Sequence, residues 1–135
     1  LAEKGIKYIQ GTRRMTEPNP CSKSKFHKRY LGQQNSYGQI NLVRNIFFEP
    51  SLIHSTDIVR DCIGQMAIAF MMNKPAVISS HRVNFVGFID EKNRDRNLKL
   101  LSNLLKEAIK RWPDIEFLTS VSLGALIADS VSNKK

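Results

Sequence analysis

The residues best suited to chemistry lie in the segment 74–90, KPAVISSHRVNFVGFID. A short apolar run at 76–78 is followed at once by polar residues that include His81, Arg82 and Asn84. In α/β proteins, strands that are buried on both faces are apolar throughout, and reactive groups follow their carboxyl ends. An imidazole, a fixed cation and an amide can together form a binding pocket. The alternative is that His81 only hydrogen-bonds a loop, and the residue types leave both interpretations open.

A second polar cluster lies at and beyond the end of another apolar run, 40–44. It contains Arg44, Asn45 and Glu49. Arg44 can orient a carboxylate or another ligand oxygen, and the other two side chains can hydrogen-bond hydroxyl groups of a ligand. Equally, Arg44 and Glu49 can form a buried ion pair that braces the loop. The same choice between ligand binding and structural support applies to Arg82 and Asn84.

Hydrophobic patterns predict four strands and three helices. The strands are expected at residues 6–10, 40–44, 76–78 and 115–118. The helices are expected to begin after a cap at Ser55 or Thr56, near Asp90, and at Ser120 or Ser122, and to end near residues 73, 112 and 131. Strands that alternate with helices are typical of an α/β fold with mostly parallel strands and crossover helices. About four strands are too few to close a barrel, so the sheet is expected to have an open edge.

The length of 135 residues fits a single domain, 1–135, with a long basic loop at 12–39. The net charge is +9, and residues 1–36 contribute most of it, with eight Lys or Arg against two Glu. A basic loop surrounded by solvent is the simplest explanation. A nucleic-acid partner is not expected, because the charge is gathered in a loop and the patch of basic and aromatic residues at 26–30 is small.

Other functional classes find little support in the sequence. No apolar run approaches the roughly 20 residues that a membrane span needs, and no secretory signal is visible, so a cytoplasmic location is favoured. Cys21 and Cys62 are expected to be reduced thiols, and their spacing is not that of a metal site. The chain has no G-x-S-x-G motif, which disfavours a serine hydrolase. Leu1 to Gly5 has the pattern of the last turn of a helix, so we expect the chain to be the C-terminal part of a longer protein.

Three stretches carry a resemblance to a known family. They are LAEKGIKYIQG at 1–11, NLVRNIFFEPS at 41–51 and KPAVISSHRVNFVGFIDEKNRDRNLKLLSNLLKEAIKRWPDIEFLTSVSLGALI at 74–127. In this order they resemble the C-terminal portion of bacterial polysaccharide deacetylase-like proteins, a carbohydrate esterase family. The resemblance covers most of the chain outside the basic loop. It implies a distorted (β/α) barrel, of which this chain would form a part with about four mostly parallel strands.

The family hydrolyses acetyl groups from sugars with a bound divalent metal, often zinc. Its metal ligands are an aspartate and two histidines near the N-terminal end of the domain. The corresponding Asp-Asp and His-x-x-x-His motifs do not occur in this chain, whose histidines are His27, His54 and His81. The resemblance therefore implies that the intact enzyme holds a metal, that these residues bind none, and that they hydrolyse nothing alone.

One catalytic role is implied for this chain. The family has a histidine after a late strand that acts as general acid toward the leaving group, and His81 in ISSHRVN matches it. Ser79 stands where the family usually has a leucine. The residues that we expect to bind the carbohydrate substrate are the other polar groups near the strand ends, namely Arg44, Asn45, Glu49, Arg82 and Asn84.

The sheet of such a fragment needs a partner, either a second copy of the chain or the missing N-terminal half. The alternative function is a non-catalytic module that binds carbohydrate or a polyanion. It would use either the pocket at the strand ends or the basic loop. Salt-dependent retention on a polyanion would favour this alternative.

Overall fold

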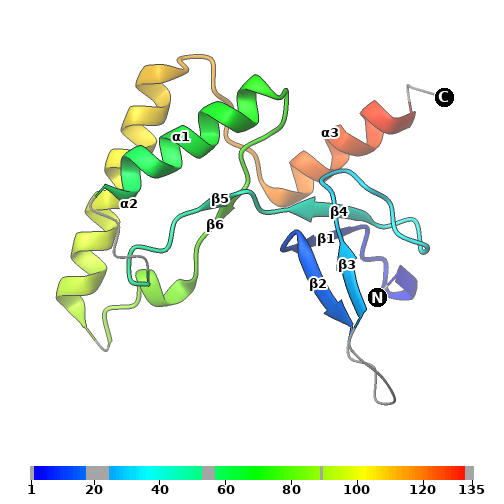
Figure 1. The fold of residues 1–135 in the computed structure, drawn as a ribbon, viewed down its shortest axis with the longest axis horizontal. Helices are drawn as coiled ribbons and strands as arrows, with labels where there is room; N and C mark the ends of the chain where they lie inside the picture. Colours follow the sequence, from blue (N-terminus) through cyan, green and yellow to red (C-terminus); the bar gives the residue numbers. More distant parts are fainter. Residues whose placement is uncertain (1, 18–24, 53–56, 89, 133–135) are drawn as a thin grey trace. The chain divides into compact units, whose positions relative to one another are not determined.

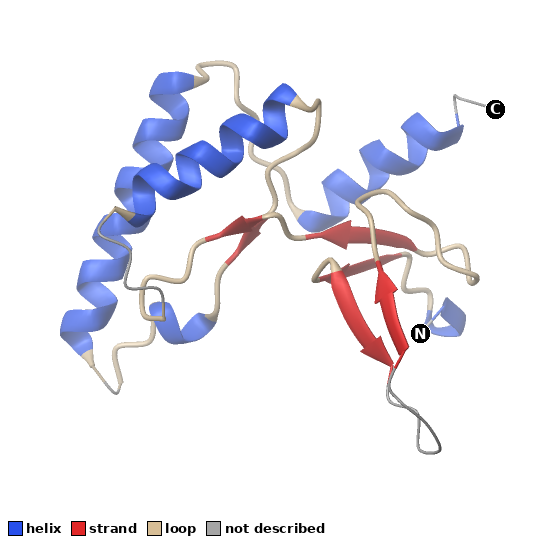
Figure 2. Ribbon diagram, in the orientation of Figure 1, coloured by secondary structure: helices blue, strands red, loops and turns tan. Residues whose placement is uncertain are grey.

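The computed structural model describes residues 2–17, 25–52, 57–88 and 90–132. The chain is a mixed α/β protein with three helices and several short strands in the described residues (Figures 1 and 2). In chain order the strands and helices are β1 Tyr8–Gly11, β2 Arg14–Glu17, β3 Lys25–Lys28, β4 Ile40–Val43, β5 Ile46–Phe47, α1 Ile58–Met71, β6 Ile78–Ser79, α2 Glu91–Arg111 and α3 Ser120–Ser132. Two short 3-10 helices are η1, Ala2–Lys4, and η2, Arg82–Asn84.

The chain divides into two compact units. The first unit consists of Leu1–Arg44 and Phe117–Lys135, and the second unit is Asn45–Glu116. Each unit has its own pair of parallel strands, β1 with β4 and β5 with β6. The α/β class predicted from the alternation of strands and helices is therefore confirmed at this level.

The first unit is built around the parallel pair β1 and β4. Tyr8 lies opposite Ile40 and Gly11 opposite Val43, and all four residues of β4 are buried. Helix α3 packs against both strands. Its Gly124 lies against the Tyr8 ring so closely that an added Cβ would come within 2.6 Å of ring carbons. Glycine here lets the helix approach the strand.

The long loop predicted at 12–39 contains regular structure, so this prediction was wrong in part. Strands β2 and β3 pair in antiparallel register, with Arg14 opposite Lys28 and Thr16 opposite Phe26 (Figure 1). The polar composition suggested a loop because the described part of this ribbon exposes its side chains on both faces. Such strands lack the apolar alternation by which half-buried strands are recognised.

A second correction concerns the strand predicted at 115–118. The structure has no strand there, and the amide of Ile115 donates to the carbonyl of Trp112 in a turn, 3.0 Å away. Phe117 and Leu118 are exposed. The apolar β-branched and aromatic residues at 115–118 have strand propensity. Propensity alone does not produce a strand without a neighbouring strand to pair with.

The second unit packs α1 against α2 and α1 against β5. Its core is apolar, and the fully buried side chains Ile46, Phe48, Cys62, Leu104 and Ala108 come from β5, the segment after it, and both helices. The Asp57 carboxylate caps α1 by accepting from the amide of Arg60, and Asp90 caps α2 by accepting from the amide of Asn93. Asp57 thus has the capping role predicted for Ser55 or Thr56, two residues outside the described part of the chain.

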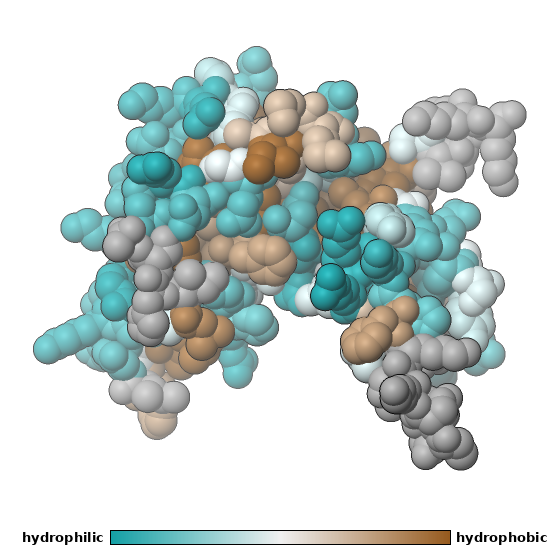
Figure 3. Space-filling model, in the orientation of Figure 1, coloured by the Kyte–Doolittle hydropathy of each residue, from teal (hydrophilic) through white to brown (hydrophobic). Residues whose placement is uncertain are grey.

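The surface of the described residues is mixed. Figure 3 shows one face of the molecule, which is largely hydrophilic with smaller hydrophobic patches. Exposed large apolar side chains include Phe26, Met71 and Phe88. None of the described helices has both the length and the apolar character needed to cross a membrane.

Candidate active site

Parallel pairing of β5 with β6 brings Glu49 and His81 together. Ile46 lies opposite Ile78 and Phe47 opposite Ser79, so each residue of the first strand faces the residue 32 positions later. Continued two residues beyond the strand ends, the same register places Glu49 opposite His81. The backbone supports this continuation, because the amide of Phe48 donates to the carbonyl of Ser79 over 2.9 Å. The contact between the two side chains is a direct consequence of strand register.

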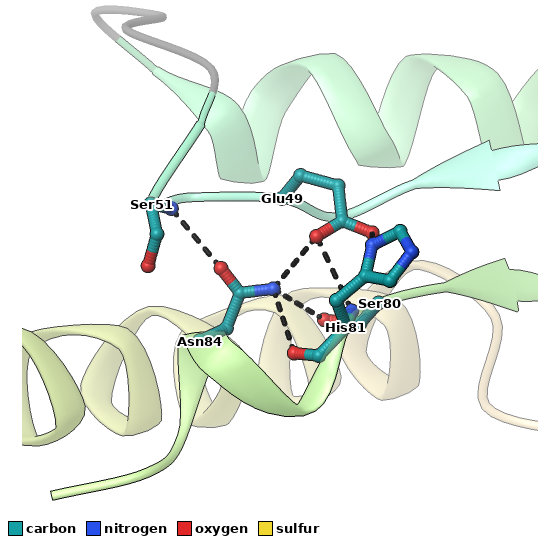
Figure 4. A network of polar contacts seen from close by, with 5 residues as sticks. All are labelled: Glu49, Ser51, Ser80, His81 and Asn84. Carbon is teal, nitrogen blue, oxygen red and sulfur yellow. Dashed lines mark hydrogen bonds and ion pairs between the residues drawn. The ribbon is translucent and has the colours of Figure 1, made fainter.

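Glu49 is a buried carboxylate with three hydrogen-bond donors. Its side chain contacts Nδ1 of His81 at 2.7 Å, the amide of His81 at 3.2 Å and Nδ2 of Asn84 at 2.8 Å (Figure 4). The residue is only 6% exposed. A carboxylate removed from water is costly unless donors replace its hydration, and here they do.

The His81 ring is oriented by this contact. An ionised carboxylate can only accept a hydrogen bond, so the contact assigns a proton to Nδ1. The other ring nitrogen, Nε2, faces away from the network in Figure 4, and the side chain is 62% exposed. A neutral imidazole in this state offers a lone pair at Nε2, and a protonated one offers an acidic N–H at the same atom. The geometry therefore suits proton transfer at Nε2.

Asn84 supports the Glu49 carboxylate with its side-chain amide. Its side chain is fully buried and its Nδ2 lies within hydrogen-bond distance of Glu49 Oε2, of Ser80 Oγ at 3.1 Å and of the carbonyl of His81 at 3.0 Å. Its Oδ1 accepts from the amide of Ser51 over 3.1 Å. A fully bonded buried amide holds its neighbours in one arrangement.

Helix α2 contributes a further buried amide. Asn97 is fully buried and its Nδ2 lies 2.9 Å from both the carbonyl of Asn84 and the hydroxyl of Ser51. Asn97 was not among the residues predicted from the sequence. The signal was present, since Asn97 occupies the same buried face of α2 as Leu104 and Ala108. A polar residue in an apolar stripe indicates a partner that needs a hydrogen bond.

The remaining predicted site residues lie elsewhere or have other contacts. Asn45 precedes β5, where its side chain accepts from the amide of Val77 at 2.7 Å and donates to the carbonyl of Pro75 at 3.0 Å. The Asn45 side-chain amide thus joins the start of β5 to the segment that precedes β6. Arg82 is exposed on η2 beside the pair. Arg44 belongs to the first unit, and its Nε is buried without a hydrogen-bond partner among the described residues.

Cys62 is not suited to nucleophilic chemistry. It is fully buried and its thiol donates to the carbonyl of Phe47 over 3.3 Å. Burial, and secondarily the charge of Asp61, raises the pKa of the Cys62 thiol to about 11. A thiol in this environment is neutral at physiological pH and behaves as an apolar core side chain. Cys21, the other predicted free thiol, lies outside the described residues.

Among the described residues, no three His, Cys, Asp or Glu side chains are grouped as ligands of one ion. An open hollow of about 620 Å³ borders α1, but it is lined by other residues, including Arg60, Gln65 and Arg111. The Glu49–His81 pair is the candidate site because a buried carboxylate orients an exposed imidazole there.

Comparison with protein-family models, curated proteins and solved structures finds no match for this chain. Function is therefore inferred from the geometry of the pair and from the resemblance noted in the sequence.

Proposed function

We propose that this chain is the C-terminal part of a metal-dependent polysaccharide deacetylase-like hydrolase, and that His81 is its general acid. In this proposal the two parallel strand pairs belong to a partial (β/α) barrel. The observation that carries the proposal is the pairing of His81 with the buried Glu49, because it leaves Nε2 exposed and able to exchange a proton.

The proposed step is protonation of the leaving group. Water adds to the acetyl carbonyl carbon and releases one proton to solvent, and the resulting tetrahedral oxyanion collapses to acetic acid with cleavage of the bond from that carbon to the sugar nitrogen or oxygen. The electron pair of this bond passes to the sugar atom, which takes the proton from Nε2 of His81. The imidazole becomes neutral, and its Nδ1–H stays hydrogen-bonded to Glu49. General acid catalysis of this kind contributes typically 10²–10⁴-fold to the rate.

The metal of the proposed enzyme has no ligand set in the described residues. We therefore assign its ligands to the part of the enzyme outside this chain and derive no step through it. Arg82 stays a proposed substrate-binding residue because its exposed side chain neighbours His81. Arg44 and Asn45 also remain proposed substrate-binding residues. The Asn45 side-chain amide has a structural role as well, because it is hydrogen-bonded to the segment before β6.

The test uses the complete open reading frame that encodes this chain. Acetate release is measured from an acetylated chitooligosaccharide and from 4-nitrophenyl acetate, for the natural protein and for His81→Ala. We expect the variant to lose about 10²–10⁴-fold on the sugar substrate. The loss should be much smaller on the aryl ester, because nitrophenolate leaves without a proton. Lys99→Gln, at an exposed position on α2, is the matched control and should keep the natural rates.

Equal losses on both substrates would assign His81 a structural role and remove the general-acid proposal. An unchanged rate on the sugar would also refute it. If the complete protein hydrolyses no acetylated sugar but still binds one, the non-catalytic module is the correct function.

A further inference from the structure

Strands β2 and β3 form an antiparallel ribbon, and one of its faces combines basic residues with an exposed aromatic ring. Residues directly opposite in an antiparallel pair share a face, as do alternate residues along each strand. Arg14 lies opposite Lys28 and Thr16 lies opposite Phe26, so these four side chains share one face. Two like charges directly opposite each other destabilise the pairing.

Phe26 adds exposed apolar surface beside these charges. Its side chain is 75% exposed, and it stands next to Lys28 on the same face of the ribbon. Farther along, the Arg13 guanidinium carbon lies 5.8 Å from the centroid of the Tyr30 ring. Residues 12–30 contain six Lys or Arg and one Glu. The ribbon thus combines positive charge with an open aromatic ring.

We propose that this basic ribbon, the face formed by Arg14, Thr16, Phe26 and Lys28, binds an anionic polysaccharide that bears carboxylate or sulfate groups. The paired cations complement the acidic groups of the polymer, and binding relieves their mutual repulsion. The Phe26 ring packs against the apolar C–H face of a pyranose. The choice of a sugar polymer rests on the function proposed above for the second unit.

The same face is less suited to a nucleic acid. Proteins that bind single strands stack successive bases on several aromatic rings along a basic groove. The described residues of this face present a single aromatic ring, and the nearby Tyr30 ring already has a guanidinium over it. A sugar polymer needs only one such ring together with the cations. Single-stranded DNA therefore serves as the competing outcome of the test.

The experiment measures binding of the chain to polygalacturonate by isothermal titration calorimetry at 50 and 200 mM NaCl. Arg14→Gln combined with Lys28→Gln should weaken binding about tenfold at low salt and make the salt dependence shallower, because two charge contacts are lost. Phe26→Ala should weaken binding but leave the salt dependence unchanged. The control, Lys99→Gln combined with Lys106→Gln, removes the same charge from exposed positions on α2 and should bind as the natural chain does.

Each other outcome overturns the proposal. Equal weakening by both double variants would mean that only net charge matters. Tighter binding of oligothymidylate than of polygalacturonate would make the ribbon a nucleic-acid surface, and no binding of either would leave no ligand for it. Circular dichroism spectra of all variants establish that they are folded. These titrations involve no catalysis, so they are independent of the acetate-release assays. Binding of polygalacturonate by the ribbon with no effect of His81→Ala on hydrolysis would refute only the hydrolase. A catalytic effect of His81→Ala with no binding of polygalacturonate would refute only the ribbon proposal.

Discussion

At the scale of single residues, Glu49 and His81 depend on amide side chains that are buried from solvent. Asn84 donates to the Glu49 carboxylate and accepts from the amide of Ser51. Without it, a buried carboxylate and a backbone amide each lose a partner. The exposed imidazole is thus held in place by buried amides.

We expect Asn84→Ala to lower the free energy of unfolding by about 1–3 kcal/mol, because it leaves buried polar groups unsatisfied. Urea denaturation measures this loss. Asn103→Ala is the matched control, since it makes the same change at an exposed position of α2 and should alter the free energy by no more than about 0.5 kcal/mol. If both variants lose equally little, the buried amide does not support the carboxylate.

Cys62 provides a prediction that depends on pH. Burial raises the pKa of its thiol from 9.0 to about 11, so at pH 8 the folded chain holds about 100-fold less thiolate at this position than the unfolded chain. Iodoacetamide should therefore label Cys62 at least about 100-fold more slowly in the folded protein. Mass spectrometry of the tryptic peptides follows Cys62 separately from Cys21.

The same shift has a consequence for stability. A pKa that is raised by folding stabilises the protein fully below the unfolded value, and this contribution is lost as pH rises through the folded value. The free energy of unfolding should accordingly fall between about pH 9 and pH 11, and less steeply in Cys62→Ala. Labelling of the folded protein at the unfolded rate at pH 8 would contradict both expectations.

At the scale of secondary-structure elements, two helical glycines make a matched pair. A methyl group added to Gly64 in α1 would have nothing within 4 Å, whereas one added to Gly124 in α3 would lie 2.6 Å from the Tyr8 ring. Alanine favours a helix over glycine by about 0.5–1 kcal/mol. Only the second site has a neighbour that must move.

We expect Gly64→Ala to slow amide hydrogen exchange in α1, because it gains helix propensity without a clash. Gly124→Ala should accelerate exchange in α3, because the Tyr8 ring is attached to β1 and must shift to admit a methyl group. Slower exchange in both variants would mean that α3 does not pack closely on β1.

At the scale of the whole molecule, the division into two units leads to a test of the single domain predicted from the sequence. The second unit is one continuous segment, Asn45–Glu116, with its own apolar core and both residues of the candidate pair. Segments of this size can fold alone. We expect the excised segment to fold and to keep the His81 proton on Nδ1.

Long-range proton–nitrogen NMR spectra identify which imidazole nitrogen carries the proton, and the spectra of the segment and of the complete chain should agree. Glu49→Gln in the segment is the control, and it should shift the proton toward Nε2. A segment that stays unfolded would indicate that the two units form one cooperative domain, as the length of the chain predicts.

Much of the second unit was predictable because its signals are local. The apolar stripe and acidic cap of α2 predicted a helix from near Asp90 to Trp112, and the helix runs from Glu91 to Arg111. His81 and Glu49 were recognised separately, each as a polar group after an apolar run. Strand β5 was not predicted: it is only two residues long, and its pairing partner β6 lies 32 residues later in the chain.

The amino-acid sequence by itself determined which residues are helical and which polar groups follow the apolar runs, since propensity, capping and hydrophobic period act over a few neighbouring residues. Only the tertiary structure decided that Glu49 pairs with His81. Their contact joins positions 32 residues apart through the register of β5 and β6, and register depends on the packing of the whole unit. The same limit explains the β2–β3 ribbon and the failed strand at 115–118, because a strand exists only where another strand pairs with it.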